Sequence, residues 1–110
     1  MIESLVSPKT KENVLFFLAG RNEGYAREIA KYYNTSLSPV QNQLENLEIA
    51  GIIVSKAVGK TVVYRLNPRY SFYKELVNLL EKAISFLPQS ERERLLMNRR
   101  RPRRSKKPLK

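Results

Sequence analysis

The 110-residue chain contains no cysteine, no histidine and no aspartate. Without cysteine it can form neither a disulfide nor a thiolate zinc site. Without histidine it has no imidazole to transfer protons near neutral pH, and the usual histidine, cysteine and aspartate metal ligands are missing as a set. These absences argue against catalysis, and we predict a protein that is not an enzyme and uses no cofactor and no metal.

Long hydrophobic runs are missing as well. The longest uninterrupted apolar run covers residues 14–19, whereas a membrane-spanning helix needs about 20 apolar residues. The N-terminus lacks the basic and then apolar pattern of a secretory signal, and the length suits one small domain. We therefore expect a cytoplasmic protein without membrane insertion.

Positive charge is abundant but unevenly distributed. The formal net charge is +11, yet residues 1–97 carry 13 Lys and Arg against 10 Glu, while residues 98–110 carry eight basic residues and no acid. A segment so charged and so poor in apolar residues cannot offset the entropy of ordering, which predicts a disordered basic tail. Such a tail is typical of nucleic-acid binding, but an anchor for ribosomes or acidic membranes, or a solubilising extension, fits it too.

The first half of the chain predicts three helices. The first ends at Gly20 and the second at Asn34, and the third covers about 38–50 with Ser38, or alternatively Ser36, as its N-cap. Apolar residues at helical spacing define the face of each helix that is expected to be buried. These residues are Val14, Phe17 and Leu18 in the first helix, Ala26, Ile29, Ala30 and Tyr33 in the second, and Val40, Leu44 and Leu47 in the third.

Two β-branched runs on either side of Gly59 predict a hairpin. Asn67 and Pro68 then end the second strand, and a helix is predicted over about 69–87, where Pro88 stops it. A short last helix over 89–97 follows, with the spacing of Ser90 and Glu93 typical of a capping box. We therefore divide the chain into a domain of residues 1–88, a helical extension over 89–97 and the tail over 98–110.

The helix predicted over 69–87 has more apolar surface than one small core needs. Two adjacent apolar stripes cover about half of its circumference at 100° per residue. The surplus predicts a two-fold homodimer, although the first helix or the N-terminal residues 2–6 could cover it instead. The predicted interface residues are Phe72, Leu76, Leu79, Ala83 and Phe86.

Several short motifs occur in the order and at the separations of a known layout. They are Glu28-Ile29-Ala30, Ser38 followed by Val40, Leu44 and Leu47, Ala50-Gly51-Ile52-Ile53, Gly59-Lys60, and Tyr64-x-Leu66-Asn67-Pro68. On these motifs residues 24–68 resemble the DNA-binding core of ArsR-like winged-helix transcriptional regulators, and with the flanking helices the similarity covers about 10–87. It implies a mainly α winged helix-turn-helix with a small β-hairpin, to which this chain adds a C-terminal helix and the basic tail. Metal-sensing members use cysteine, histidine and aspartate ligands, so the resemblance does not extend to metal sensing.

In this layout the third helix is the recognition helix and enters the major groove of DNA. The residues expected to face the groove are Ser38, Gln41, Asn42, Glu45 and Asn46. Asn and Gln side chains pair with adenine, and a Glu carboxylate accepts from cytosine N4. Phosphates would be bound by cations around this helix, namely Arg27, Lys31, Lys56, Lys60 and Arg65, and by Arg99, Arg100, Arg101, Arg103 and Arg104 in the tail.

The sequence thus predicts a homodimeric transcriptional regulator that binds double-stranded DNA sequence-specifically and is associated with the nucleoid. Base recognition would come from an uncharged to acidic helix, and salt-sensitive affinity from cations elsewhere. Two alternatives stay open. The chain could be an architectural protein that binds nucleic acid without sequence preference, or a winged-helix module that binds a protein partner.

Overall fold

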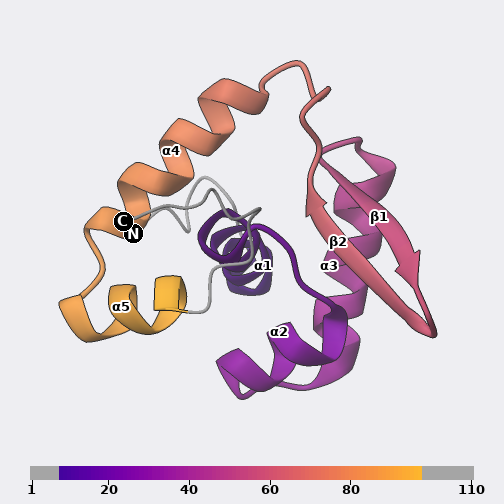
Figure 1. Cartoon of the computed structure of the whole chain (residues 1–110), viewed down its shortest axis with the longest axis horizontal. Coiled ribbons are helices and arrows are strands. Elements are labelled where there is room, and N and C mark those ends of the chain that lie inside the picture. The colour runs from indigo at the N-terminus through magenta and orange to yellow at the C-terminus, as the bar shows by residue number, and fades with distance from the viewer. Residues whose placement is uncertain (1–7, 98–110) are drawn as a thin grey trace.

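The structure is a computed structural model that describes residues 8–97. Its elements, in chain order, are α1 (Lys9–Arg21), α2 (Ala26–Tyr33), α3 (Leu37–Ile49), β1 (Ile53–Val58), β2 (Thr61–Leu66), α4 (Tyr73–Ser85) and α5 (Gln89–Met97). Within residues 8–97 three helices are followed by a two-stranded hairpin and two more helices, arranged as Figure 1 shows. The predicted class, mainly α with one small β-hairpin, is confirmed.

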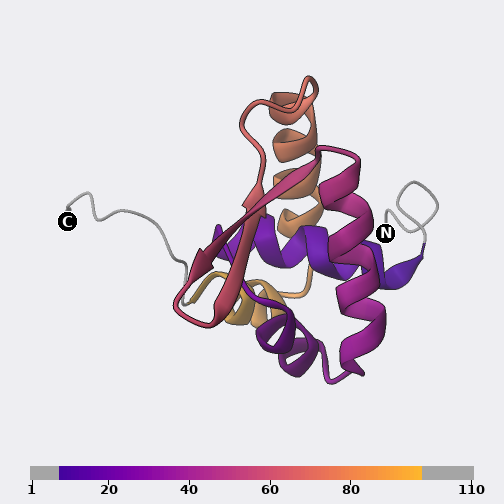
Figure 2. The same cartoon turned by 90° about the vertical axis from the view of Figure 1, so that its right-hand side faces the viewer.

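Helix α1 lies at the centre of the fold. It contacts α2, α3, α4 and α5, which surround it in Figures 1 and 2. All residues from position 14 to position 21 are buried, whereas helical spacing predicts only one buried stripe. That prediction is too narrow because α4 and α5 cover the side of α1 that faces away from α3. A helix that is apolar around most of its circumference is typical of such a central position.

Helices α2 and α3 are joined by a turn of three residues, 34–36. Asn34 has a left-handed backbone with φ +56°, and the amide of Thr35 donates to the carbonyl oxygen of Ala30 at 2.9 Å. Asparagine tolerates this conformation better than most residues, so the predicted helix end at Asn34 is confirmed. Ile29 and Ala30 are buried between α2 and its neighbours, which fixes α2 against α1 and α3.

Helix α3 begins at Leu37, with Ser36 rather than Ser38 at the N-cap position. Its end is fixed by Gly51, which has φ +81°. The Gly51 amide donates to the Glu48 carbonyl at 2.9 Å, and the Ile52 amide donates to the Leu47 carbonyl at 3.0 Å. These two bonds form a Schellman motif, in which glycine adopts the left-handed backbone without a steric penalty. The predicted end of the third helix is confirmed.

The hairpin is antiparallel, with pairs running from Ile53 opposite Leu66 to Val58 opposite Thr61. Gly59 forms the turn with φ +63°. A further contact joins β2 to the segment before α2, because the backbones of Gly24 and Tyr64 exchange hydrogen bonds of 2.8 and 3.0 Å. This bridge holds the hairpin against the helical part of the domain.

Helix α4 starts at Tyr73, four residues later than the predicted start near position 69. The intervening residues form turns because Asn67 engages the backbone on both sides. Its Oδ1 accepts from the Arg69 amide at 3.0 Å, and its Nδ2 donates to the Gly51 carbonyl at 2.9 Å. Asparagine side chains compete in this way with helical hydrogen bonding, and the bond to Gly51 also fixes the exit from β2.

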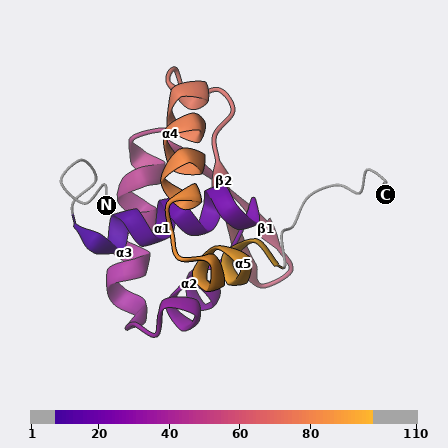
Figure 3. The same ribbon diagram turned by 90° about the vertical axis from the view of Figure 1, so that its left-hand side faces the viewer.

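Helix α5, predicted as a helical extension over 89–97, packs into the core. Leu95 is buried against Gly20, and a Cβ atom on Gly20 would lie 2.6 Å from Leu95 Cγ. Figure 3 shows α5 beside α1 and α2. The predicted capping box is wrong, because α5 begins at Gln89 and Ser90 therefore lies in its first turn. The predicted tail, 98–110, lies outside the described residues.

Candidate nucleic-acid interface

Helix α3 has one buried face and one exposed face. The buried residues are Val40, Leu44 and Leu47, as predicted. The exposed residues include the complete predicted base-reading set, Ser38, Gln41, Asn42, Glu45 and Asn46. Within residues 8–97 no other element buries these five side chains, so they are accessible to a partner. Their contact with DNA itself stays a prediction.

Ile49 is a sixth member of this exposed face, and it is absent from the predicted set. Its side chain is 80% exposed at the last position of α3. The sequence contained the signal, because a residue nine positions after Val40 lies on the opposite side of a helix at 100° per residue. An apolar side chain in the major groove can contact the methyl group of thymine, which adds a chemistry that the amides of α3 lack.

The strand register brings two predicted phosphate ligands together. Lys56 pairs with Val63, and Arg65 pairs with Val54, so Lys56 and Arg65 project from the same face of the hairpin as diagonal neighbours. Both are exposed. Lys60 is exposed in the turn after Gly59, at the tip. The β1–β2 hairpin, called the wing below, therefore presents three cations, two of them on one face.

The opposite face of the wing is held against α3. Ser55 Oγ donates to Glu48 Oε2 at 2.6 Å. Tyr64, the cross-strand partner of Ser55, has a pKa raised above its usual value by burial first and then by the carboxylates of Glu48 and Glu45. These contacts show that the Ser55 and Tyr64 side chains face α3, while Lys56 and Arg65 point away from that contact.

The predicted cations of α2, Arg27 and Lys31, are both exposed and lie one turn apart. The amide of Tyr25 donates to Glu28 Oε1 at 3.3 Å, which supports the first turn of α2. Lys31 also lines a cavity between α1, α2 and α5. Lys31 therefore shares a cavity with α5, whereas Arg27 does not line it. The two predicted phosphate-binding cations of α2 thus have different surroundings.

Charge is separated between α3 and its surroundings. Helix α3 contains two carboxylates, Glu45 and Glu48, and neither lysine nor arginine. The nearest predicted cations belong to α2 and the wing. The predicted tail ligands Arg99, Arg100, Arg101, Arg103 and Arg104 lie outside the described residues. Affinity for a polyanion must therefore come from groups that surround α3 and not from α3 itself.

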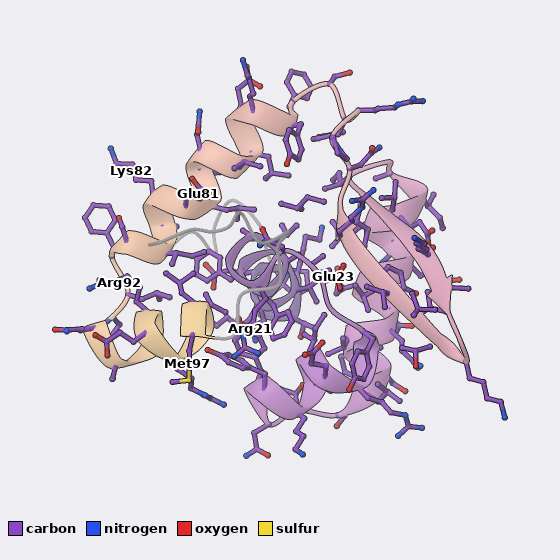
Figure 4. The ribbon with its side chains drawn as sticks, in the orientation of Figure 1. Arg21, Glu23, Glu81, Lys82, Arg92 and Met97 are labelled. Atoms are coloured by element: carbon purple, nitrogen blue, oxygen red, sulfur yellow. The ribbon has the colours of Figure 1, made fainter. Side chains whose placement is uncertain are left out.

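The apolar face of α4 is divided between core and surface. Phe72, Leu79 and Phe86 are 62, 38 and 67% exposed, and Leu76 is half-buried. Ala83 is only 4% exposed, because it belongs to the core that α4 forms with α1. Its inclusion in the predicted dimer interface is therefore wrong. Figure 4 shows Lys82 on the outer side of α4.

Among residues 8–97 there is no group of three His, Cys, Asp or Glu side chains that could hold a metal ion. No helix in the same stretch is both long and apolar enough to cross a bilayer.

A scan against models of protein families finds none that matches, and a search of curated proteins finds none either. Solved structures do match. The AntR antimony-specific transcriptional repressor superimposes with a TM-score of 0.62 at 19% identity, over 82% of this chain and 77% of AntR. The YusO protein from Bacillus subtilis gives 0.57 at 23% identity, over 82% of this chain and 70% of YusO.

The chain has the winged helix-turn-helix fold. The fold predicted from the sequence is thereby confirmed. In this fold α2 and α3 form the helix-turn-helix, with α3 in the place of the recognition helix, and the β1–β2 hairpin is the wing.

Proposed function

We propose that the protein is a transcriptional regulator that binds double-stranded DNA sequence-specifically, with α3 in the major groove. The observation that carries this proposal is the exposed polar face of α3, which no other described element covers. The Asn and Gln side chains of this face can pair with adenine, and the Glu45 carboxylate can accept a hydrogen bond from cytosine N4. The major groove is wide enough to admit one α-helix. The likeness to the AntR antimony-specific transcriptional repressor supports the regulatory part of the proposal.

Backbone phosphates would be bound by the wing. Lys56 and Arg65 share the face that points away from the Ser55 contact with α3, and Lys60 lies at the tip. Arg27 provides a further exposed cation on α2, the first helix of the helix-turn-helix. Phosphate contacts of this kind fix orientation and register without reading sequence.

The tail would supply most of the salt-sensitive affinity. Each neutralised phosphate changes the slope of log K against log salt by about −0.9 on duplex DNA. Removal of residues 98–110 should therefore flatten the salt dependence and leave sequence preference largely intact. If the full chain and the truncated chain show the same slope, the tail takes no part in binding.

We also propose that two copies associate through α4. Phe72, Leu79 and Phe86 recur every seven residues and are exposed in the single chain. Apart from the edge-to-face contact of Phe72 with Tyr70, they form an apolar stripe that the described residues leave open. A two-fold dimer would set two recognition helices on half-sites about one helical turn of DNA apart. The operator would then be a palindrome. Such a regulator would act in the cytoplasm, associated with the nucleoid.

One observation favours a second candidate function. Helix α3 carries two carboxylates, Glu45 among the proposed groove contacts and Glu48 beside them, and offers no cation. Carboxylates are repelled by phosphates. A module that binds a basic protein surface through α3 is consistent with this charge.

Selection from a random double-stranded library separates these functions. The proposed regulator should enrich a symmetric motif, and its binding should survive excess random duplex at near-physiological salt. Enrichment without a motif would indicate an architectural protein that binds nucleic acid non-specifically. The absence of any duplex binding would leave the protein-binding function.

A further inference from the structure

A cavity of about 400 Å³ lies between α1, α2 and α5, on a part of the molecule that, apart from Lys31, the predicted DNA contacts do not use. Its size falls in the range of small-molecule sites. The lining residues are Lys9, Asn13 and Phe16 from α1, Lys31, Tyr32, Tyr33 and Asn34 from α2 and its end, and Leu87, Glu91, Arg94 and Leu95 from α5 and the segment before it. All three helices thus contribute charged groups to one cavity, and α1 and α2 also contribute aromatic groups.

The charged side chains at the cavity leave a net positive charge, to which the buried Arg21 adds, 5.1 Å from the centroid of the Tyr32 ring. Lys9 is paired with Glu12, since the Nζ to Oε1 distance is 2.8 Å. Lys31 and Arg94 then contribute two positive charges, and Glu91 contributes one negative charge. Arg94 is held by neutral groups, because its guanidinium lies 4.0 Å from the centroid of the Tyr32 ring and donates to the Tyr32 carbonyl at 2.8 Å. That arrangement fixes the position of Arg94 without neutralising it.

The apolar part of the lining is aromatic. The rings of Tyr32 and Tyr33 meet edge to face, with centroids 4.7 Å apart, and Phe16 adds a third ring. Burial raises the pKa of Tyr33 well above its usual value, and Tyr32, Glu91 and Glu12 add to the shift. Its hydroxyl therefore stays protonated at neutral pH and can donate a hydrogen bond. Asn13 offers an amide at the same lining.

We propose that this cavity binds a small aromatic monocarboxylate. The ring would pack against Tyr33 and Phe16, because the Tyr32 ring is already covered by the guanidinium groups of Arg94 and Arg21, 4.0 and 5.1 Å from its centroid. The carboxylate would pair with Lys31 and Arg94, and its negative charge offsets the net positive charge at the cavity. A neutral aromatic would leave that charge unused, and an aromatic amine would add a like charge.

Binding would join α5 to α2, because Arg94 and Glu91 belong to α5 whereas Lys31, Tyr32 and Tyr33 belong to α2. A ligand that contacts both helices favours the arrangement in which they are packed together. Occupancy should therefore slow amide hydrogen exchange in α5. This inference concerns a small-molecule site and does not depend on the proposed DNA binding.

Phenylacetate is the probe, and an NMR titration of the full-length ¹⁵N-labelled protein is the measurement. Phenethylamine and phenethyl alcohol serve as charge controls, and acetate serves as the control without a ring. Saturable shifts at the amides of Tyr32, Tyr33 and Glu91 with phenylacetate, and much weaker shifts with the three controls, would support the site. Equal effects of the acid and the amine, shifts confined to α3 or α4, or no saturation at millimolar phenylacetate would overturn it.

Two substitutions of opposite sign separate charge recognition from structural damage. Lys31→Gln should weaken phenylacetate binding, and Glu91→Gln should strengthen it, each by roughly two- to fivefold, since partly exposed charges contribute modestly. Lys74→Gln on α4 is the matched control, because Lys74 is exposed and does not line the cavity, and it should leave the affinity unchanged. Equal affinities of the wild-type, Lys31→Gln and Glu91→Gln proteins would contradict the proposal even if all three fold normally.

Discussion

The Nε atom of Arg21 donates a 2.8 Å hydrogen bond to the carbonyl oxygen of Leu95, 74 residues later in the chain. A second bond of 3.0 Å runs from Arg21 Nη2 to the carbonyl of Arg94. Both carbonyls belong to the last turn of α5, where a helix leaves carbonyls without an internal partner. The guanidinium also lies 5.1 Å from the ring centroids of both Phe17 and Tyr32. Figure 4 shows Arg21 between α1, α2 and the end of α5 that carries Met97. One buried cation thus fixes α5 to the rest of the domain.

Replacement of Arg21 by leucine should destabilise the protein by about 2–4 kcal/mol, because two carbonyls lose their charged donor while the site stays closed to water. Urea denaturation followed by circular dichroism measures this change. Arg69→Leu is the control, since Arg69 is exposed and its side chain forms no hydrogen bond within residues 8–97; its cost should stay below about 0.5 kcal/mol. Equal losses for the two variants would mean that the bonds from Arg21 contribute nothing specific.

Hydrophobic periodicity was sufficient to predict the frame of the fold. The spacing of Val40, Leu44 and Leu47 predicted the buried face of α3, and it thereby predicted which residues of that helix are exposed. Gly51 and Asn34 predicted two helix ends, because both residues tolerate the left-handed backbone that those ends require. These features depend on local geometry, which a single sequence contains.

Features that depend on contacts between distant residues could not be predicted. The packing of Leu95 on Gly20 makes α5 part of the core, and no local pattern near Leu95 indicates that contact. Asn67, whose side chain forms the turns before α4, is held by its bond to the Gly51 carbonyl, 16 residues earlier. Ala83 matched both a core stripe and a surface stripe by spacing, and only its packing against the rest of the fold assigns it to the core. The missed exposure of Ile49, by contrast, followed from helix periodicity alone.

The stability of the fold should depend on Tyr33 in alkaline solution. Burial raises the pKa of Tyr33 in the folded protein above its value in the unfolded chain, which is about 10. The folded state therefore holds this proton more tightly, so the associated stability is fully present below about pH 10 and is lost as the pH rises further. Tyr33→Phe removes the titrating hydroxyl, and its free energy of unfolding should fall less steeply between about pH 10 and pH 11.5 than that of the wild type. Tyr70→Phe, at a surface turn, is the control variant. If wild type and Tyr33→Phe show the same slope, Tyr33 does not titrate differently in the two states.

Leu79 is the test of the proposed dimer. It lies between Phe72 and Phe86 on the exposed stripe of α4, so Leu79→Glu would place a charge in the middle of an apolar interface. We expect the variant to sediment as a monomer under conditions in which the wild type sediments as a dimer, because a buried unpaired carboxylate costs several kcal/mol. Lys74→Gln is the control, since Lys74 is exposed on α4 and does not belong to this stripe. A Leu79→Glu protein that stays dimeric would exclude this stripe as the interface, and a monomeric wild type would exclude the dimer altogether.

Asn42 and Lys60 test the proposed division between base reading and phosphate binding. Asn42 lies on the exposed face of α3 and Lys60 at the tip of the wing. Asn42→Ala should weaken binding to the selected site by about 1–3 kcal/mol and change binding to random duplex little. Lys60→Ala should weaken binding to all duplexes by similar amounts and reduce the magnitude of the salt slope by about 1. Affinities for cognate and random duplex, measured by fluorescence anisotropy across a salt series, distinguish the two effects.

Lys74→Ala, on the exposed side of α4, is the control for loss of a charge away from the interface. The opposite pattern, with Asn42→Ala acting on all sequences and Lys60→Ala on the selected site alone, would contradict the docking of α3 in the major groove, because a neutral amide at a base edge cannot produce a salt-dependent loss that is common to every sequence.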